Sequence, residues 1–473
     1  MNSDNTVLSS EKEDIAAFRA AIISTLDAII SSIDSDDAFS GINPYELRKR
    51  IGELPFLPEH GDGWDNVLES VKTDILPHML RTWSPSYMPH LHSPALIESI
   101  AAELIIAAFN SSMDSWDQGP AATEIEVRTI RELCRLFGYT DDSDGVFTSG
   151  GSQSNISAAI IFRDMFIEKL TGRDVKKHGL PDDFYKLRLY TSEISHFSFD
   201  KGAHMMGLGY DSVVKLPVDE KERIDIGKAR EIIREDYERG LHPFLIAATI
   251  GTTDFGSIDD IQQLREIADE FGMFLHADAA YGSGAILSSY RKRIGDLSLA
   301  DSITVDFHKM FLLPISASAL LVRNGKNLDV FQLHADYLNR EEDEEDGYIN
   351  LVGKSMQTTR RFDALKVYIS FRMRGKDGYR RIMDTAIGNA AYFYERISRD
   401  DDFIAPIEPE LSSVVFALRG GDDRNKKTRR RLLSEGVVIG QTVFEGKTML
   451  KFTLLNPALT HEHIDRLIER IKE

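Results

Sequence analysis

A chain of 473 residues, 42% of them hydrophobic and 28% charged, can bury a large core and has the composition of a soluble globular protein. Its 56 Lys and Arg residues against 76 Asp and Glu residues give a net charge of −20, which opposes binding to nucleic acid or to an anionic membrane surface. There is no run of 18 uncharged apolar residues, no signal-like start, and only one cysteine, Cys134, so we expect a cytoplasmic protein without a membrane span or disulfide.

The first two thirds of the chain predict helices followed by alternating strands and helices. Apolar side chains at helical spacing predict helices over residues 11–33 and 64–76. The expected strands cover residues 146–148, 187–190, 244–250, 274–277, 302–305 and 317–322. The expected helices between them cover residues 123–137, 154–170, 226–238 and 261–271, the last with Asp259 as its N-cap. Such alternation indicates βαβ units and a mostly parallel sheet flanked by helices.

The last third changes character. Six consecutive acidic residues at 341–346 repel one another and predict a mobile loop within residues 339–353, either functional or merely solvated. A helix over 379–398, strands over 414–418, 437–439 and 449–454, and a helix over 461–471 predict a small α/β domain. We therefore divide the chain into an N-terminal helical segment (1–85), a large domain (86–375) and a small C-terminal domain (376–473).

Two motifs place reactive side chains at the ends of predicted strands. Residues 302–311 end a strand in the pair His308-Lys309, and a lysine that loses its proton there is an amine nucleophile. Residues 274–282 end a strand in Asp278, which could pair with a pyridinium nitrogen. Taken alone, the His-Lys pair is more typical of an exposed surface, and the aspartate of a capped turn.

Two further motifs suit a phosphorylated aromatic ligand. Residues 147–155 place glycines and hydroxyl side chains at the start of a helix, where free N–H groups favour a phosphate, although the Gly-Lys-Ser/Thr of a Walker loop is missing. His196 follows a strand and could stack on an aromatic ring. Each has an ordinary alternative, because glycine-rich helix entries occur without ligands and a lone histidine is more often structural.

The order of these motifs is more specific than any one of them. The glycine-rich loop, His196, Gly251-Thr252-Thr253, Asp278 and Lys309 all follow successive strands of one predicted sheet. This arrangement resembles the group II decarboxylases that depend on pyridoxal 5′-phosphate (PLP), over roughly residues 84–378. The resemblance implies an α/β fold of the PLP-dependent transferase type I (aspartate aminotransferase-like), with a small C-terminal α/β domain, PLP as the cofactor and no metal.

By this resemblance, Lys309 would be the Schiff-base lysine, Asp278 would pair with the pyridine nitrogen, and His196 would stack on the ring. The remaining cofactor contacts that the resemblance implies are Gly151 and Ser152 at the phosphate, Thr253, and His308. It assigns His92 and Ser93 to substrate binding. Tyr348, the only tyrosine of residues 340–353, would protonate the carbanion at Cα from a loop that closes over the site.

The family is dimeric, so we expect a homodimer with its active site at the interface and the N-terminal segment wrapped over the partner. Residues 110–118, 334–339 and 355–366 resemble the branch that acts on diamino acids, including L-2,4-diaminobutyrate and siderophore-pathway lysine decarboxylases. The alternative is that these segments are dimer-interface structure shared between branches. The expected reaction converts an L-amino acid, such as 2,4-diaminobutyrate, lysine or ornithine, to an amine and CO2. The alternatives are an aromatic amino acid or glutamate decarboxylase, an aldehyde synthase on the same fold, and a silent PLP-binding homologue.

Overall fold

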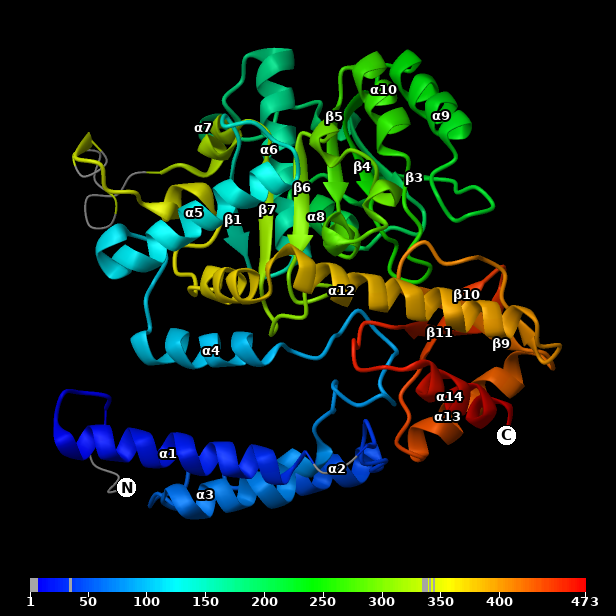
Figure 1. Cartoon of the computed structure of the whole chain (residues 1–473). Coiled ribbons are helices and arrows are strands. Elements are labelled where there is room, and N and C mark those ends of the chain that lie inside the picture. Colours follow the sequence, from blue (N-terminus) through cyan, green and yellow to red (C-terminus); the bar gives the residue numbers. More distant parts are fainter. Residues whose placement is uncertain (1–6, 34–35, 334–338, 340–341, 343–344) are drawn as a thin grey trace.

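The computed structural model of the chain describes residues 7–33, 36–333, 339, 342 and 345–473. Residues 334–338 and half of the acidic run 341–346 lie outside the described residues. Figure 1 shows a large α/β body, a smaller sheet near the C-terminus, and N-terminal helices that lie below the body.

The large body is built on a sheet of seven strands among the described residues, in the order β1-β7-β6-β5-β4-β2-β3. Its strands are β1 Asp144–Thr148, β2 Leu187–Ser192, β3 Val213–Leu216, β4 His242–Thr249, β5 Phe274–Asp278, β6 Ser302–Asp306 and β7 Ser318–Val322. Strands β3, β2, β4, β5 and β6 pair in parallel, whereas β7 runs antiparallel to both β6 and β1. Strands β1, β2, β4, β5 and β6 therefore all end at the same edge, and the predicted mostly parallel sheet is confirmed.

Helices cover both faces of this sheet because alternate strand residues point to opposite sides. In β4, Leu245 and Ala247 pack in the core under α6 and α8, while Ile246 and Ala248 pack under α9 and α10. The helices of the body are α4 Ile97–Phe109, α5 Pro120–Leu136, α6 Gly151–Thr171, α7 Val175–His178, α8 Ser198–Met205, α9 Ile226–Glu238 and α10 Ile261–Phe271. Strands buried on both faces explain why their sequences are continuous apolar runs.

The C-terminal sheet has the order β10-β11-β9-β8 and is reached through the long helix α12. Its elements are α12 Ala364–Ser398, β8 Phe403–Ile404, β9 Ser413–Leu418, α13 Asp422–Ser434, β10 Gly440–Phe444, β11 Lys447–Thr453 and α14 His461–Lys472. Helix α12 crosses the boundary that we predicted at residue 375, with non-helical backbone at Gly375 (φ 59°, ψ −175°). The division into three domains stays a prediction.

Two local predictions are wrong, and one strand was missed. Asp260, not Asp259, caps α10 by accepting from the N–H of Gln263, whereas Asp259 is buried and accepts from the N–H groups of Thr249 and Ile224. Residues 437–439 are not a strand, because this short run makes only an isolated bridge from Val438 to Tyr87, and the strand follows at β10. Strand β3 was missed because it has only four residues, too few for a clear alternation.

The N-terminal helices are α1 Lys12–Ser31, α2 Pro44–Gly52 and α3 Trp64–Ser70. The helix predicted over 64–76 is divided, since α3 gives way to a wider π-helical turn at Val71–Ile75 and a 3-10 turn at Leu76–His78 that contains a proline. In the described part of the chain, no helix has both the length and the apolar character needed to cross a bilayer.

Candidate active site

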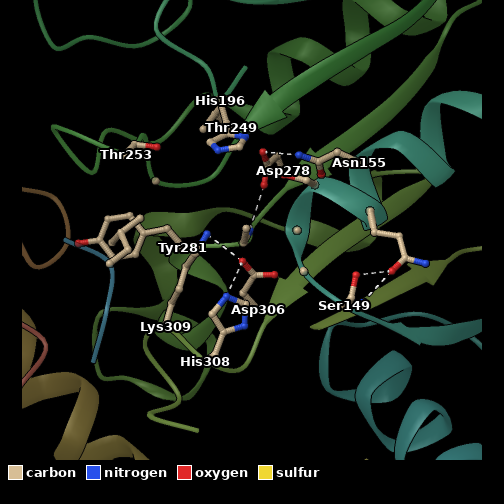
Figure 2. A pocket seen from close by; sticks show the side chains of 17 residues that line it. Ser149, Asn155, His196, Thr249, Thr253, Asp278, Tyr281, Asp306, His308 and Lys309 are labelled. Atoms are coloured by element: carbon tan, nitrogen blue, oxygen red, sulfur yellow. Dashed lines mark hydrogen bonds and ion pairs between the residues drawn. The ribbon is translucent and has the colours of Figure 1, made fainter. Parts of the chain in front are cut away.

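Side chains from five strand ends surround one cavity of about 310 Å³ (Figure 2). The polar residues that line it follow β1, β2, β4, β5 and β6, where the parallel strands end together. They are Ser149, Ser152, Gln153, Asn155, His196, Thr249, Thr253, Asp278, Tyr281, Asp306, His308 and Lys309. The structure thus brings together seven of the predicted site residues, six of them polar and the seventh Gly151.

Asp278 is a buried carboxylate at the end of β5. One oxygen accepts from the side-chain amide of Asn155 at 2.8 Å and the other from the N–H of Ala280 at 3.2 Å. Burial raises the pKa of Asp278, while the positive charge of Lys309 and the hydrogen bond from Asn155 act in the opposite direction. A carboxyl group in this position gains from a cationic partner in the cavity.

A second layer of polar side chains holds Asp278 from behind. Asn155 also donates to Ser198 at 2.9 Å, and its oxygen accepts from Thr304 at 2.7 Å and lies 3.0 Å from Nε2 of His276. Nδ1 of His276 is 2.7 Å from the Ser302 hydroxyl. Burial lowers the pKa of His276 to about 3, so this ring is neutral and connects α6, β5 and β6 beneath the cavity.

Lys309 is anchored by a carboxylate that the sequence motif contained but to which we assigned no role. Its Nζ lies 2.8 Å from Oδ2 of Asp306, the last residue of β6, and Oδ1 of Asp306 accepts from Ser318 at 2.6 Å. His308 points Nε2 toward the same carboxylate at 3.7 Å, and its Nδ1 donates to the carbonyl of Ala317 at 2.9 Å. Asp306 is only 2% exposed, so cations in solution have little access to its carboxylate.

The glycine-rich loop begins α6 at the cavity wall. A close approach favours glycine at position 151, because a Cβ there would lie 3.1 Å from both carboxylate oxygens of Asp306 and from the Cβ of Ala280. The N-cap residue Gly150 provides no side-chain cap, so the first N–H groups of the helix are available to an anion. Ser149 is instead tied to Gln153, whose oxygen accepts from both its N–H and its hydroxyl at 2.8 Å.

His196 and the turn after β4 complete the cavity. Burial lowers the pKa of His196, and its Nδ1 accepts from the N–H of Ser198 at 3.2 Å, which fixes the ring. Gly251 has φ +97°, and a Cβ there would lie 2.7 Å from Leu411, so this turn needs a glycine. Thr253 follows it and lines the cavity.

The predicted substrate-binding and loop residues do not line the cavity. Ser93 donates to the carbonyl of His308 at 3.4 Å, and His92 bonds Tyr87 at 3.0 Å, but Leu91 is the lining residue of this segment. Tyr348 packs edge-on against Trp116, with ring centroids 5.1 Å apart, and is not among the residues that line the cavity of its own chain.

The residues present fit PLP. The side-chain hydroxyl of Thr249 and the amide nitrogen of Gln153 are buried at the cavity wall without hydrogen-bond partners in the described part of the chain, which indicates a polar ligand. Free N–H groups at one end of the cavity suit a phosphate, and the buried Asp278 suits a protonated ring nitrogen. Lys309 would supply the amine that holds the aldehyde.

Sequence reasoning assigned no role to Asn155 and Asp306. They lie in the motifs of residues 147–155 and 302–311, and a usable signal was present for each. Asn155 is an amide on a helix face that is otherwise small and apolar, and Asp306 is an acid at the end of a predicted strand. Buried polar groups at such positions require partners, and here the partners are Asp278 and Lys309.

Comparison with known proteins agrees with this geometry. A family model described as the pyridoxal-dependent decarboxylase conserved domain matches residues 46–419. L-2,4-Diaminobutyrate decarboxylases of Acinetobacter baumannii and Rhizobium meliloti (strain 1021) are 33% and 34% identical, over 98% and 99% of this chain and 94% and 93% of their own lengths. A crystal structure from Vibrio parahaemolyticus, described as the glutamate decarboxylase domain of diaminobutyrate-pyruvate transaminase and L-2,4-diaminobutyrate decarboxylase, is 35% identical with a TM-score of 0.91, covering 98% of this chain and 96% of that chain. The chain therefore belongs to the pyridoxal-dependent decarboxylase family and is a PLP-dependent amino acid decarboxylase.

Proposed function

We propose that this enzyme decarboxylates a diamino acid, with L-2,4-diaminobutyrate ahead of ornithine and lysine. The observation that carries the proposal is the near-complete alignment with two L-2,4-diaminobutyrate decarboxylases at 33% and 34% identity. When bound, PLP delocalises the electrons that remain on Cα after the carboxyl group leaves as CO2.

The cavity residues have distinct roles in this proposal. Lys309 holds the cofactor through its amine, and Asp278 keeps the ring nitrogen protonated, with Asn155 fixing the orientation of the carboxylate. His196 stacks on the ring as a neutral imidazole. The remaining contacts are Gly151 and Ser152 at the phosphate, Thr253 and His308 around the cofactor, and His92 and Ser93 toward the substrate.

An acidic hollow beside the cavity supports the proposal that the substrate is cationic. Its carboxylates are Glu193, Asp219, Glu220, Glu222, Asp254 and Glu445. It adjoins the cavity through the Thr252–Asp254 turn, since Thr252 and Asp254 line the hollow and Thr253 lines the cavity. Asp254 is paired with Lys451 at 2.8 Å, whereas the pKa of Glu222 is raised by burial and by the neighbouring carboxylates of Glu193, Asp219 and Glu445. The negative field of these carboxylates raises the local concentration of a diamino acid at low ionic strength.

A substrate panel tests the proposal. We expect kcat/KM, measured from CO2 release, to be highest for 2,4-diaminobutyrate, with ornithine and lysine next and glutamate and tyrosine last. A higher value for glutamate or tyrosine would overturn it. Aldehyde and ammonia in place of the amine would identify an aldehyde synthase, and bound PLP without CO2 from any substrate would identify a silent homologue.

Charge removal tests the acidic hollow separately. Glu220→Gln together with Glu222→Gln should lower kcat/KM for a diamino acid and weaken its dependence on salt, because the steering field is reduced. The same variant should leave any residual activity toward tyrosine unchanged. Equal losses for both substrates would point to structural damage and not to steering.

We also propose a cytoplasmic homodimer with the active site at the interface. Apolar side chains on α1 and α4 are exposed in the single chain, namely Ile15, Phe18, Leu26, Ile29, Ile30, Ile97, Ile100, Leu104, Ile105 and Phe109. Exposed apolar surface of this kind supports an interface with a second copy. Leu26→Asp on α1 should dissociate the dimer in sedimentation experiments, whereas Tyr237→Asp on α9, another exposed apolar position, should not.

Tyr348 would act as the proton donor to Cα within this dimer. Because its ring packs against Trp116 and does not line the cavity of its own chain, the proposed role requires either that Tyr348 moves or that it acts in the active site of the partner subunit. A phenol is a weak acid that can donate a proton to a strong base formed beside it.

A further inference from the structure

The cavity contains a second buried carboxylate, and it is the one that contacts Lys309. Asp306 binds the Lys309 ammonium at 2.8 Å through Oδ2 and accepts from Ser318 at 2.6 Å through Oδ1. Two carboxylates, Asp278 and Asp306, thus share the cavity with one lysine. An ammonium held in this way has no lone pair with which to attack an aldehyde.

Asp306 also lies directly against the start of α6. If position 151 carried a Cβ, that atom would lie 3.1 Å from both carboxylate oxygens of Asp306, so the backbone at the start of α6 lies close against this carboxylate. A phosphate held by the first N–H groups of α6 would therefore lie beside Asp306. Two anions in a site with little solvent repel, and the carboxyl group relieves the repulsion by taking up a proton.

The nearest proton source is Lys309 itself. Among the described residues, three other titratable groups face this pair. Nε2 of His308 lies 3.7 Å from the Asp306 carboxylate, while Asp278 at the end of β5 and His196 after β2 interact electrostatically with the charge on Lys309. The wall formed by α6 contributes Ser152 and Gln153, and β7 contributes Ser318, none of which is charged.

We propose that a phosphate bound at the start of α6 drives a proton from Nζ of Lys309 to Oδ2 of Asp306, so that phosphate binding itself produces the nucleophilic amine. One N–H bond breaks and one O–H bond forms, leaving a neutral amine and a neutral carboxylic acid. The acid then donates its hydrogen bond to a phosphate oxygen, and the amine attacks the aldehyde carbon with loss of one water. The inference rests on the proposed role of Lys309 as the residue that holds PLP.

The test separates the phosphate from the aldehyde. Cofactor-free, full-length protein is mixed with pyridoxal, which lacks the phosphate, with and without inorganic phosphate. Attachment at Lys309 is timed by borohydride trapping and peptide mass. An ordinary lysine titrates near pH 10.4, so at pH 7 only about one amine in 2,500 is unprotonated and a large acceleration is possible. We expect phosphate to accelerate attachment at least about tenfold at pH 7, with a gain that shrinks as the pH approaches 10.

Asp306→Asn removes the proton acceptor, so this variant should show no phosphate gain, whatever its basal rate. Asp278→Asn replaces the other buried carboxylate of the cavity and should keep the gain. Circular dichroism of each variant checks folding, and if Asp306→Asn does not fold, the absence of a phosphate gain in the unmodified chain alone overturns the inference. An equal gain in Asp306→Asn also overturns it. Failure of both pyridoxal and PLP to attach at Lys309 would instead overturn the proposed role of that lysine.

Discussion

Replacing His276 with glutamine removes an ionisable group from the layer that supports Asp278. The imidazole is fully buried, with Ser302 at 2.7 Å on one nitrogen and Asn155 at 3.0 Å on the other. Protonation would place a charge in a site with no acidic partner in direct contact, which is why burial lowers its pKa to about 3. Glutamine retains an amide that can bond to Asn155 but cannot titrate.

The magnitude follows from proton linkage. An unfolded histidine titrates near pH 6.5, so between about pH 6.5 and 3 the unfolded chain binds a proton that the folded chain does not. Stability is therefore full above pH 6.5 and is lost as the pH falls through this window. At pH 5 the loss is roughly 1.5 pH units at about 1.36 kcal/mol each, or about 2 kcal/mol.

The assay is urea unfolding of the cofactor-free full-length chain between pH 7.5 and 5, at one fixed protein concentration because subunit association adds to apparent stability. Hydrogen bonds lost in His276→Gln lower stability equally at every pH, so the comparison uses the slope of the free energy of unfolding against pH. The unmodified chain should lose about 2 kcal/mol more than the variant across this range. His60→Gln, at an exposed histidine in the loop before α3, should keep the original slope. Parallel slopes for the unmodified chain and His276→Gln would refute the reasoning.

Three substitutions test the proposed roles of the site residues. Lys309→Ala should abolish turnover and borohydride-trapped PLP, because Lys309 is the only lysine among the described residues that line the cavity, and activity with PLP trapped elsewhere would disprove the role. Asp278→Asn should keep the fold but lower kcat by about a hundredfold, since the ring nitrogen loses its charged partner, and near-normal turnover would remove Asp278 from that role. Tyr348→Phe should still bind PLP and substrate but yield less amine relative to carbonyl products, and an unchanged amine yield and rate would exclude Tyr348 as the proton donor.

Long and continuous patterns were predictable from the sequence. The helices over 226–238 and 261–271 agree with α9 and α10, because their apolar stripes are regular and their ends carry clear signals. The prediction was wrong where neighbouring candidates differ only in tertiary contact. Asp259 and Asp260 are identical in chemistry, and burial against β4 decides that the first binds N–H groups of other segments while the second caps the helix.

The site was predictable to the extent that strand ends meet at one edge. Lys309, Asp278 and His196 could be placed together because each follows a strand of a parallel sheet. The partners of these residues could not be placed, because they depend on packing between layers: Asn155 reaches Asp278 from α6, and Ser318 reaches Asp306 from β7. Spacing along the sequence carries no information about such contacts.

The two carboxylates of the cavity are chemically identical, but their positions at the ends of different strands give them different surroundings. Asp278 and Asp306 end neighbouring parallel strands, yet Asp278 is held by neutral donors and Asp306 by the Lys309 ammonium beside the start of α6. In our proposal, the first therefore faces the cationic end of PLP and remains ionised, while the second faces the anionic end and is the group that takes a proton. A positive charge lowers the proton affinity of a carboxylate and a negative charge raises it, so the polarity of the ligand alone is sufficient to give the two aspartates opposite roles.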